Sequence, residues 1–316
     1  KEANVLNVQA LNTLEEQVVN RMADLNVASQ KGMIENFDST IGASTVLMPF
    51  GGKYQLTETQ AGVQKLHVRK GITNTASILS YGYNPFISEK SPFHGSQLAI
   101  LESMAKIVAV GGDYKKIRFT FQEYFEKLGK EETKWGKPFA ALLGAVYMQN
   151  QFHLPAIGGK DSMSGTFKHL NVPPTLVSFA IATENSARII SPEFKKRGNK
   201  IYFLPSPVGK DVKIDIQKTK QLLEFGNQQI ETGTIISGYT IQFGGIIEAL
   251  AKMSFGNDLG FDIQTNLSLF DYQYGGFVVE TEQELTYPES VLLGHVSDQM
   301  VINGEKWNIG GLQGQP

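Results

Sequence analysis

Helical and strand periods alternate along the chain, and this interleaving restricts the fold more than any other feature. Apolar residues recur at helical spacing over 97–112, whereas Val177, Phe179 and Ile181 alternate as in a half-buried strand. Helices are expected at 12–26, 97–112, 120–128, 138–152, 216–225 and 244–255, and strands at 63–68, 175–182, 200–204, 276–280, 291–296 and 300–302. This order predicts an α/β or α+β fold in two lobes.

The two lobes are expected to meet at a proline-rich hinge. Val172 precedes two prolines, and a residue before proline favours extended backbone. We therefore assign 1–36 to a linker and leading helix, 37–171 to an N-terminal mixed-sheet lobe, and 172–316 to a C-terminal α/β lobe. The leading helix begins with Thr13 and Glu16 at the spacing of a capping box.

Composition excludes several classes of protein. The chain has 29 basic and 31 acidic residues and a net charge of −2, which argues against a nucleic-acid or anionic-membrane partner. It has no cysteine, so disulfides and thiol nucleophiles are excluded. Apolar runs such as 98–101 are far shorter than the roughly 20 residues that span a bilayer. We expect no membrane partner and a cytoplasmic location.

The segment from Gly158 to Gly165 is the part of the sequence with the most groups suited to binding or catalysis. Its sequence, Gly-Gly-Lys-Asp-Ser-Met-Ser-Gly, combines flexible backbone with one cation, one carboxylate and two hydroxyls. Such loops can present amide groups and a lysine to a phosphate. A solvated Gly-Gly turn explains the same composition, so both interpretations stay open. The segment is not a Walker A loop, because Asp161 follows the lysine where serine or threonine is required.

Other catalytic and metal-binding patterns are absent from the sequence. The five histidines lack metal-ligand spacing, and neither a zinc-protease nor a serine-hydrolase motif occurs. Glu102 is a single carboxylate on a predicted helix, and Lys106 follows it by four residues. That spacing favours a salt bridge over a metal site.

The 158–164 segment closely resembles the Gly-Lys-Asp-Ser-Met-Ser segment of the phosphoribosylformylglycinamidine synthase family, in its large, single-chain form. Segments 37–42, 97–112 and 238–245 are also similar to family segments, in the same order. The resemblance implies a two-lobed fold of the aminoimidazole-ribonucleotide-synthetase type. It also implies that this chain is the second of two such halves. The partners would then be the remaining half and the glutaminase domain of the same polypeptide.

The family's activity is the ATP- and glutamine-dependent amidation of formylglycinamide ribonucleotide (FGAR) in purine biosynthesis, a carbon–nitrogen ligase reaction. ATP activates the formamide oxygen, and ammonia from glutamine displaces phosphate. The resemblance implies ATP and Mg²⁺ as cofactors of the full-length enzyme, with FGAR and glutamine as substrates. It places a nucleotide- or substrate-binding loop at Gly158, Gly159, Lys160, Asp161, Ser162 and Ser164. No residue of this half is implied as certainly catalytic.

The resemblance also places Glu102 where large-form members hold a metal ion beside a second, structural ADP. The companion ligands are replaced, because Lys65, Lys106 and Thr240 stand where the family has oxygen ligands. Magnesium requires oxygen ligands, so this substitution predicts a poor metal site. We expect Glu102 to pair with Lys106 or Lys65, and no tightly bound cofactor in this chain.

Three functional hypotheses follow. In the first, this half is mainly structural and contributes one active-site loop to the synthase. In the second, it is a degenerate, non-catalytic nucleotide-binding or structural module. In the third, it is a stand-alone kinase-like relative of the same fold. The first predicts that the isolated chain is inactive. It also predicts an exposed sheet face, which would drive the isolated chain to form homodimers.

Overall fold

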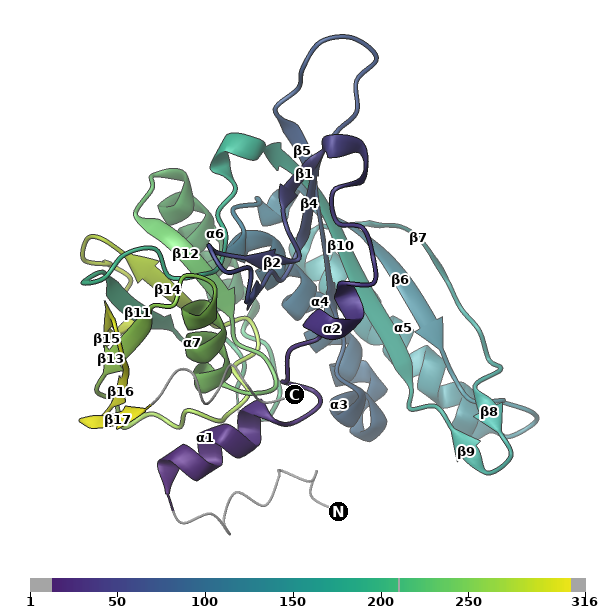
Figure 1. Ribbon diagram of the computed structural model, residues 1–316. Helices are drawn as coiled ribbons and strands as arrows, with labels where there is room; N and C mark the ends of the chain where they lie inside the picture. The colour runs from purple at the N-terminus through teal and green to yellow at the C-terminus, as the bar shows by residue number, and fades with distance from the viewer. Residues whose placement is uncertain (1–12, 210, 308–316) are drawn as a thin grey trace.

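A six-stranded mixed sheet organises the first part of the chain (Figure 1). The computed structural model describes residues 13–209 and 211–307. In sheet order the strands are β1 (Thr45–Leu47), β4 (Gly62–Lys65), β5 (Thr75–Gly82), β10 (Thr175–Asn185), β6 (Arg118–Tyr124) and β7 (Ala156–Lys160). Neighbouring strands are antiparallel except β6 and β7, which are parallel. β7 therefore forms one edge of the sheet.

A seven-stranded sheet organises the second part. Its order is β12 (Ile235–Thr240), β14 (Phe277–Thr281), β11 (Lys200–Leu204), β15 (Val291–Ser297), β13 (Gly260–Ile263), β16 (Met300–Ile302) and β17 (Glu305–Trp307). Two small hairpins pair β2 (Phe50–Gly51) with β3 (Thr57–Glu58) and β8 (Thr166–Phe167) with β9 (Leu170–Asn171). Both large sheets are mixed, which confirms the predicted fold class.

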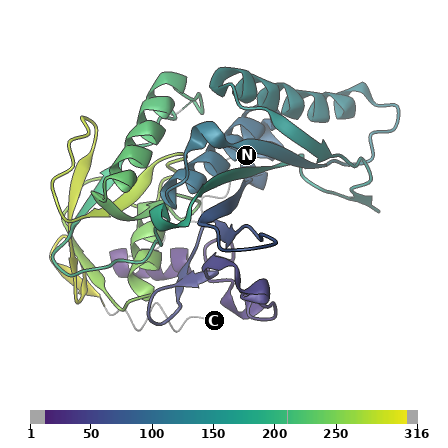
Figure 2. The ribbon, with the colours of Figure 1, turned by 90° about the horizontal axis from the view of Figure 1, so that it is seen from above.

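Helix α4 (Pro92–Ala109) lies between the two sheets and contacts β5, β10 and β12. It is buried on nearly every side, as expected for a helix enclosed by other elements. The other helices are α1 (Leu14–Met22), α2 (Lys31–Ile34), α3 (Pro85–Lys90), α5 (Glu132–Phe152), α6 (Ile216–Glu231) and α7 (Ile246–Phe255), and the 3₁₀ turns are at 41–43, 114–116 and 186–188. Helix α5 packs on α4, and Figure 2 shows α5 and α6 along one edge of the molecule.

The two hydrophobic cores meet at the second sheet. Tyr202 and Leu204 of β11 join the core around α4, whereas Ile201 and Phe203 join the core around α7. This alternation buries both faces of the sheet. In contrast, the six-stranded sheet is partly exposed on the face opposite α4 and α5, where Leu79 is 46% exposed.

Several predicted elements are confirmed. Helix α1 begins with the predicted capping box between Thr13 and Glu16. Strands β11 and β16 coincide with the predicted strands at 200–204 and 300–302. None of the helices in the described residues has the length and apolar character needed to cross a membrane.

The helix predicted at 120–128 is wrong, because this segment contains most of strand β6. Thr120 and Glu123 imitate a capping box, but Phe119, Phe121 and Glu123 alternate with more exposed residues in a strand. Antiparallel pairing with β10 on one side and parallel pairing with β7 on the other holds β6 in extended form. Tertiary pairing here overrides the local helical signal.

Two helix starts also differ from the prediction. Helix α4 begins at Pro92, because the Ser91 hydroxyl accepts the His94 N–H and Pro92 suits the first helical position. The residue before the expected start at 97, Ser96, therefore lies inside the helix and does not cap it. Helix α5 begins at Glu132, so Pro138 lies in its interior rather than at its start.

The first part of the loop expected from Gly158 to Gly165 instead belongs to strand β7, which extends from Ala156 to Lys160. The predicted hinge at 172–174 does not separate the two sheets. Strand β10 follows it and pairs with β5 and β6 of the first sheet. The chain therefore changes sheet after Asn185. Helix α1 packs against α7, so part of the predicted linker joins the second core, and residues 1–12 and 308–316 lie outside the described ranges.

Candidate functional site

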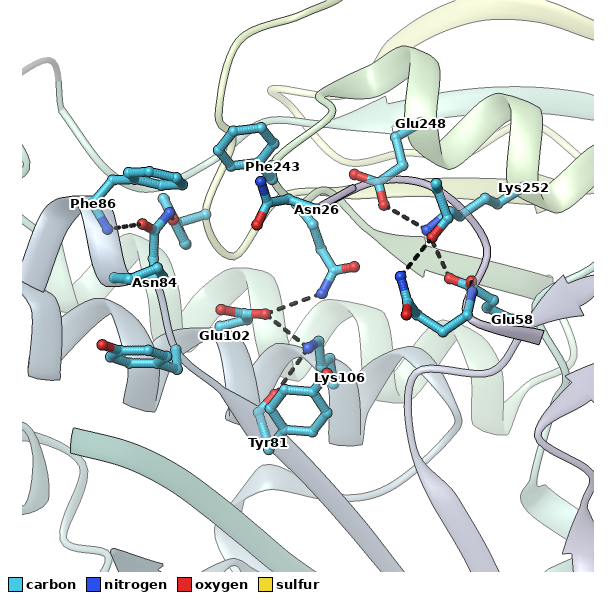
Figure 3. A pocket seen from close by; sticks show the side chains of 16 residues that line it. Asn26, Glu58, Tyr81, Asn84, Phe86, Glu102, Lys106, Phe243, Glu248 and Lys252 are labelled. Atoms are coloured by element: carbon cyan, nitrogen blue, oxygen red, sulfur yellow. Dashed lines mark hydrogen bonds and ion pairs between the residues drawn. The ribbon is translucent and has the colours of Figure 1, made fainter. Parts of the chain in front are cut away.

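A polar pocket of about 280 Å³ lies between the two sheets (Figure 3). Helix α4 contributes Glu102 and Lys106 to its wall, and helix α7 contributes Glu248 and Lys252. In each pair the lysine follows the glutamate by four residues, so both side chains project from the same face of their helix. The pocket therefore has two internal acid–base pairs.

The two side chains of the first pair are in direct contact and nearly buried. The Lys106 Nζ lies 2.7 Å from a Glu102 carboxylate oxygen, with the lysine side chain 3% exposed. The same ammonium donates to the Tyr81 carbonyl at 2.9 Å, and the Gln242 amide donates to the Glu102 carboxylate at 3.0 Å. The predicted bond between Glu102 and Lys106 is thus confirmed.

The second pair is extended by a third residue, because Lys252 contacts two carboxylates. The Lys252 ammonium lies 2.9 Å from Glu248 and 2.6 Å from Glu58 of β3. Burial by itself lowers the pKa of a lysine, yet the Glu248 and Glu58 carboxylates hold the pKa of Lys252 well above its ordinary value. The backbone N–H of Gly244 also donates to Glu248 at 2.7 Å. Lys252 is therefore a permanent cation inside the pocket.

Together, these contacts pair the two ammonium groups of the pocket with its three carboxylates, which leaves a single negative charge. Each ammonium occupies a position next to carboxylates that a bound metal would otherwise fill. A hydrated Mg²⁺ at Glu102 would meet the Lys106 ammonium at close range, where like charges repel. The pocket as built favours neutral or weakly charged contents over a metal–diphosphate group.

Two of the predicted companions of Glu102 lie elsewhere. Lys65 ends strand β4 and does not line the pocket, so of the two expected partners of Glu102 the structure has Lys106. Thr240 ends β12, and its backbone exchanges two hydrogen bonds with the Gln60 side chain. The Thr240 hydroxyl is buried without a hydrogen-bond partner among the described residues. Gln242, which sequence reasoning missed, contacts Glu102 in addition to Lys106.

The predicted loop residues lie together at the free edge of the six-stranded sheet. Gly158, Gly159 and Lys160 belong to edge strand β7, and all three are exposed. Gly159 permits close packing, because a Cβ there would lie 2.8 Å from the Phe121 carbonyl oxygen. An edge strand has backbone groups that its own sheet leaves unpaired, and these are available to a ligand.

After Lys160 the chain turns back towards β6. The Phe125 N–H donates to the Ser162 carbonyl at 2.8 Å, and the Gly165 N–H donates to the Phe125 carbonyl at 2.9 Å. The hydroxyls of Ser162 and Ser164 lie 2.8 Å apart. Within the described residues, Lys160 and Asp161 have no ion-pair partner, so the charges of this segment remain available.

Glu123 of β6 is a further polar residue of this region that sequence reasoning missed. It is 7% exposed, and its carboxylate has neither a hydrogen bond nor an ion pair within the described residues. Burial, reinforced by the Asp161 charge, raises the pKa of Glu123 to about 7. Sequence reasoning missed Glu123 because it assigned the segment to a short helix.

No group of three or more histidine, aspartate or glutamate side chains in the described residues could hold a metal ion. Any metal at either place would therefore need ligands from a bound molecule or from water.

Comparison with known proteins identifies what the chain is similar to. No family profile matches it. It is 23% identical over 279 residues to the PurL subunit of phosphoribosylformylglycinamidine synthase from Thermoplasma volcanium, covering 79% of this chain and 34% of that protein. It is 24% identical over 319 residues to PurL from Picrophilus torridus, covering 92% and 42%. The chain is PurL-like.

Solved structures agree with this similarity at the level of the fold. Thermotoga maritima PurL complexed with ATP superposes with a TM-score of 0.62 at 17% identity, over 85% of this chain and 41% of that chain. Thiamine monophosphate kinase from Aquifex aeolicus superposes with a TM-score of 0.54 at 12% identity, over 77% and 94%. PurL and the kinase share the aminoimidazole-ribonucleotide-synthetase-like fold, which confirms the expected architecture.

The PurL similarity covers most of this chain but only part of each relative. The chain spans 34–42% of the length of the first PurL relatives that it matches.

Proposed function

We infer that the chain is the second synthetase-like half of a longer phosphoribosylformylglycinamidine synthase, and that it contributes one active-site loop. The observation that carries this proposal is the exposed 158–164 segment on edge strand β7, in a chain that is PurL-like over most of its length. The whole polypeptide would be an ATP-dependent carbon–nitrogen ligase that uses glutamine as its nitrogen source. Its location would be the cytoplasm.

The 158–164 segment is suited to a phosphate group. Lys160 supplies a point charge without an internal partner, and the unpaired edge of β7 supplies backbone amides. In the proposed reaction, phosphate charge builds up on the activated formamide oxygen and leaves with the phosphate when ammonia attacks. Lys160 and the amides would stabilise that charge, while Asp161 and Ser162 would orient the loop.

The Glu102 pocket takes no part in this reaction. It corresponds to the place where a second, structural ADP is expected from the family resemblance, but Lys106 and Lys252 already form ion pairs with its carboxylates. We infer that no nucleotide or magnesium binds there, and that this part of the half is structural. ATP and Mg²⁺ would bind elsewhere in the full-length enzyme. Solved PurL structures carry ATP, ADP or AMPPCP, which supports a nucleotide-binding role for the whole enzyme.

The partly exposed face of the six-stranded sheet is the proposed contact with the first half. Leu79 on β5 lies opposite Ile181 on β10, and both belong to this apolar face. Solved relatives include a PurLQS assembly and a PurL complex with FGAR, which support partner subunits and FGAR as substrate. A glutaminase domain in the same polypeptide is part of the proposal.

The proposal is tested in the full polypeptide that contains this chain, by measuring amidation of FGAR with ATP and glutamine. Lys160→Ala is expected to lower kcat/KM by about 100-fold or more, the loss typical of removing one group that stabilises developing charge. Lys130→Ala, an exposed lysine without an ion pair, is the control and should leave the rate unchanged. Equal rates for the wild type and Lys160→Ala would instead favour a non-catalytic structural module.

A further inference from the structure

Helix α5 has an apolar face that is exposed to solvent. Six large apolar side chains of this helix are between 41% and 64% exposed: Trp135, Phe139, Leu142, Leu143, Val146 and Tyr147. They recur at intervals of three and four residues, so they share one face of the helix. The buried residues of α5, such as Ala141 and Ala145, lie on the opposite face, and the helix packs on α4. Surface helices usually present polar residues to water, so this apolar face indicates a missing partner.

The exposed face of α5 has no charged residue. After Glu132, the charged residues of the helix are Lys134 and Lys137, and both pair with Glu126. The centres of protein interfaces are likewise depleted of charge and enriched in aromatic residues. An anionic lipid surface would instead require free basic residues beside the apolar face. The composition of α5 therefore favours an uncharged protein surface as its partner.

The face is also rigid. Helix α5 has 21 residues and rests on the buried helix α4. The Trp135 indole N–H donates to the Gly129 carbonyl at 3.1 Å, which holds the largest side chain of the face in place. Fixed aromatic side chains bind a partner at a low cost in conformational entropy. The face is thus already arranged for docking.

A partner on the exposed face of the six-stranded sheet would leave α5 uncovered. Helices α4 and α5 lie on one side of that sheet, whereas the exposed Leu79 lies on the other side. Figure 2 shows α5 at the outer edge of the molecule. The first synthetase-like half, proposed above as the partner of the sheet face, therefore does not account for α5.

The size of the face distinguishes between two kinds of partner. The six side chains together expose roughly 500–600 Å², since an aromatic side chain offers about 150–250 Å². A stable complex of separate proteins buries about 800 Å² on each partner, which is more than this face supplies. A smaller contact is sufficient between domains of one polypeptide, because the linker keeps the second domain at a high effective concentration. The area therefore favours a domain of the same polypeptide over a second copy of the chain.

We propose that the outer face of α5 is the docking surface for a further folded domain of the same polypeptide, which contacts it through an uncharged apolar surface. This domain differs from the first half, which occupies the sheet face. The proposal rests on the proposed function for the existence of a longer polypeptide. The chain spans 34–42% of the first PurL relatives, so those relatives have further protein outside the matched region.

The test measures the reactivity of introduced cysteines in the full polypeptide. This chain has no cysteine, so one introduced thiol is unique within it. The variants are Phe139→Cys and Val146→Cys on the face, with Leu267→Cys, in the second half of the chain, as the control. Labelling by iodoacetamide is followed by mass spectrometry of the peptide with the new thiol, and each rate is normalised to that of the urea-unfolded polypeptide.

The proposal predicts the reverse of the order of exposure. Phe139 is 64% exposed, Val146 is 48% exposed and Leu267 is 38% exposed. We nevertheless expect the thiols at 139 and 146 to react at least tenfold more slowly than the thiol at 267. Equal rates, or faster labelling at 139 and 146, would overturn the proposal. If Phe139→Cys fails to fold by circular dichroism, Val146→Cys decides the question.

Protein concentration separates the proposed partner from a second copy of the chain. Protection that persists from micromolar to nanomolar polypeptide supports a domain of the same polypeptide, whereas protection lost on dilution would overturn the proposal. Labelling does not measure amidation, so the two proposals can fail separately. Protection of α5 without FGAR amidation would overturn the proposed function alone, and amidation with α5 freely labelled would overturn this inference alone.

Discussion

In the pocket between the sheets, Glu102 has an ammonium at 2.7 Å and Glu248 has one at 2.9 Å. At the edge of the first sheet, Lys160 and Asp161 are exposed and have no ion-pair partner among the described residues. Both regions carry charged side chains, but only in the first do those side chains pair with one another. The difference teaches that burial leads charged groups of one chain to pair, whereas exposure at a sheet edge leaves such groups available to a ligand.

The largest expected effect is on the stability of the pocket. Lys106→Ala leaves the Glu102 carboxylate buried without its cation, and breaking a buried ion pair in this way costs about 3–5 kcal/mol of unfolding free energy. Urea unfolding of the isolated chain measures this loss. The double variant Glu102→Gln with Lys106→Met removes both charges and should recover most of the stability. A loss below 1 kcal/mol in the single variant would mean that the ion pair of Glu102 and Lys106 contributes little to stability.

At the loop the same kind of substitution should have the opposite sign. Burial and the Asp161 charge raise the pKa of Glu123 to about 7, so Glu123→Gln removes an unfavourable charge and should stabilise the chain by about 1–3 kcal/mol at pH 8. Thermal unfolding in the presence of a chelator is the appropriate measurement. Glu126→Gln, which breaks ion pairs with Lys134 and Lys137, should destabilise the chain. If both variants destabilise it, the contrast between the two glutamates is not real.

The exposed sheet face gives a smaller effect, on self-association. If this face pairs with another half in the full enzyme, the isolated chain should dimerise through it. Leu79→Ser places a hydroxyl on the face and should weaken dimerisation about tenfold, or about 1.4 kcal/mol. Sedimentation velocity over a range of concentrations measures the association. Leu267→Ser changes an exposed leucine outside the first sheet and serves as the control. A wild-type chain that stays monomeric at high micromolar concentration would contradict this prediction.

The smallest effect is a pH dependence at Glu126. The hydrogen bond from Lys137, together with the charges of both lysines, lowers the pKa of Glu126 below its ordinary value. Its contribution to stability is therefore present above the unfolded-state pKa of about 4.3 and is lost as pH falls through the lower folded-state value. Because Lys137 is 42% exposed, solvent screening limits the contribution to about 1 kcal/mol or less.

The check at Glu126 compares the unfolding free energies of the wild type and Lys137→Ala. We expect the wild type to be more stable at pH 7 and the two proteins to converge near pH 3. A difference that stays constant between these pH values would assign the effect to packing of the lysine stem rather than to its charge.

Sequence reasoning predicted the fold class, the bond between Glu102 and Lys106, and most helices of the second half, because these depend on local periodicity and i,i+4 spacing. It failed at 118–124, where pairing with strands distant in sequence decides between helix and strand. The same failure hid Glu123, whose importance comes from its neighbours across the sheet. It also placed Lys65 beside Glu102, since an alignment to family motifs does not show where a strand end lies in space.

The most direct test of the contrast between the two regions is a crystal structure of the chain grown with ATP and MnCl₂. We expect phosphate oxygens close to Lys160, and the pair of Glu102 and Lys106 intact with no nucleotide beside it. A nucleotide in the pocket between the sheets, with manganese bound to Glu102 and Lys106 displaced, would contradict the account.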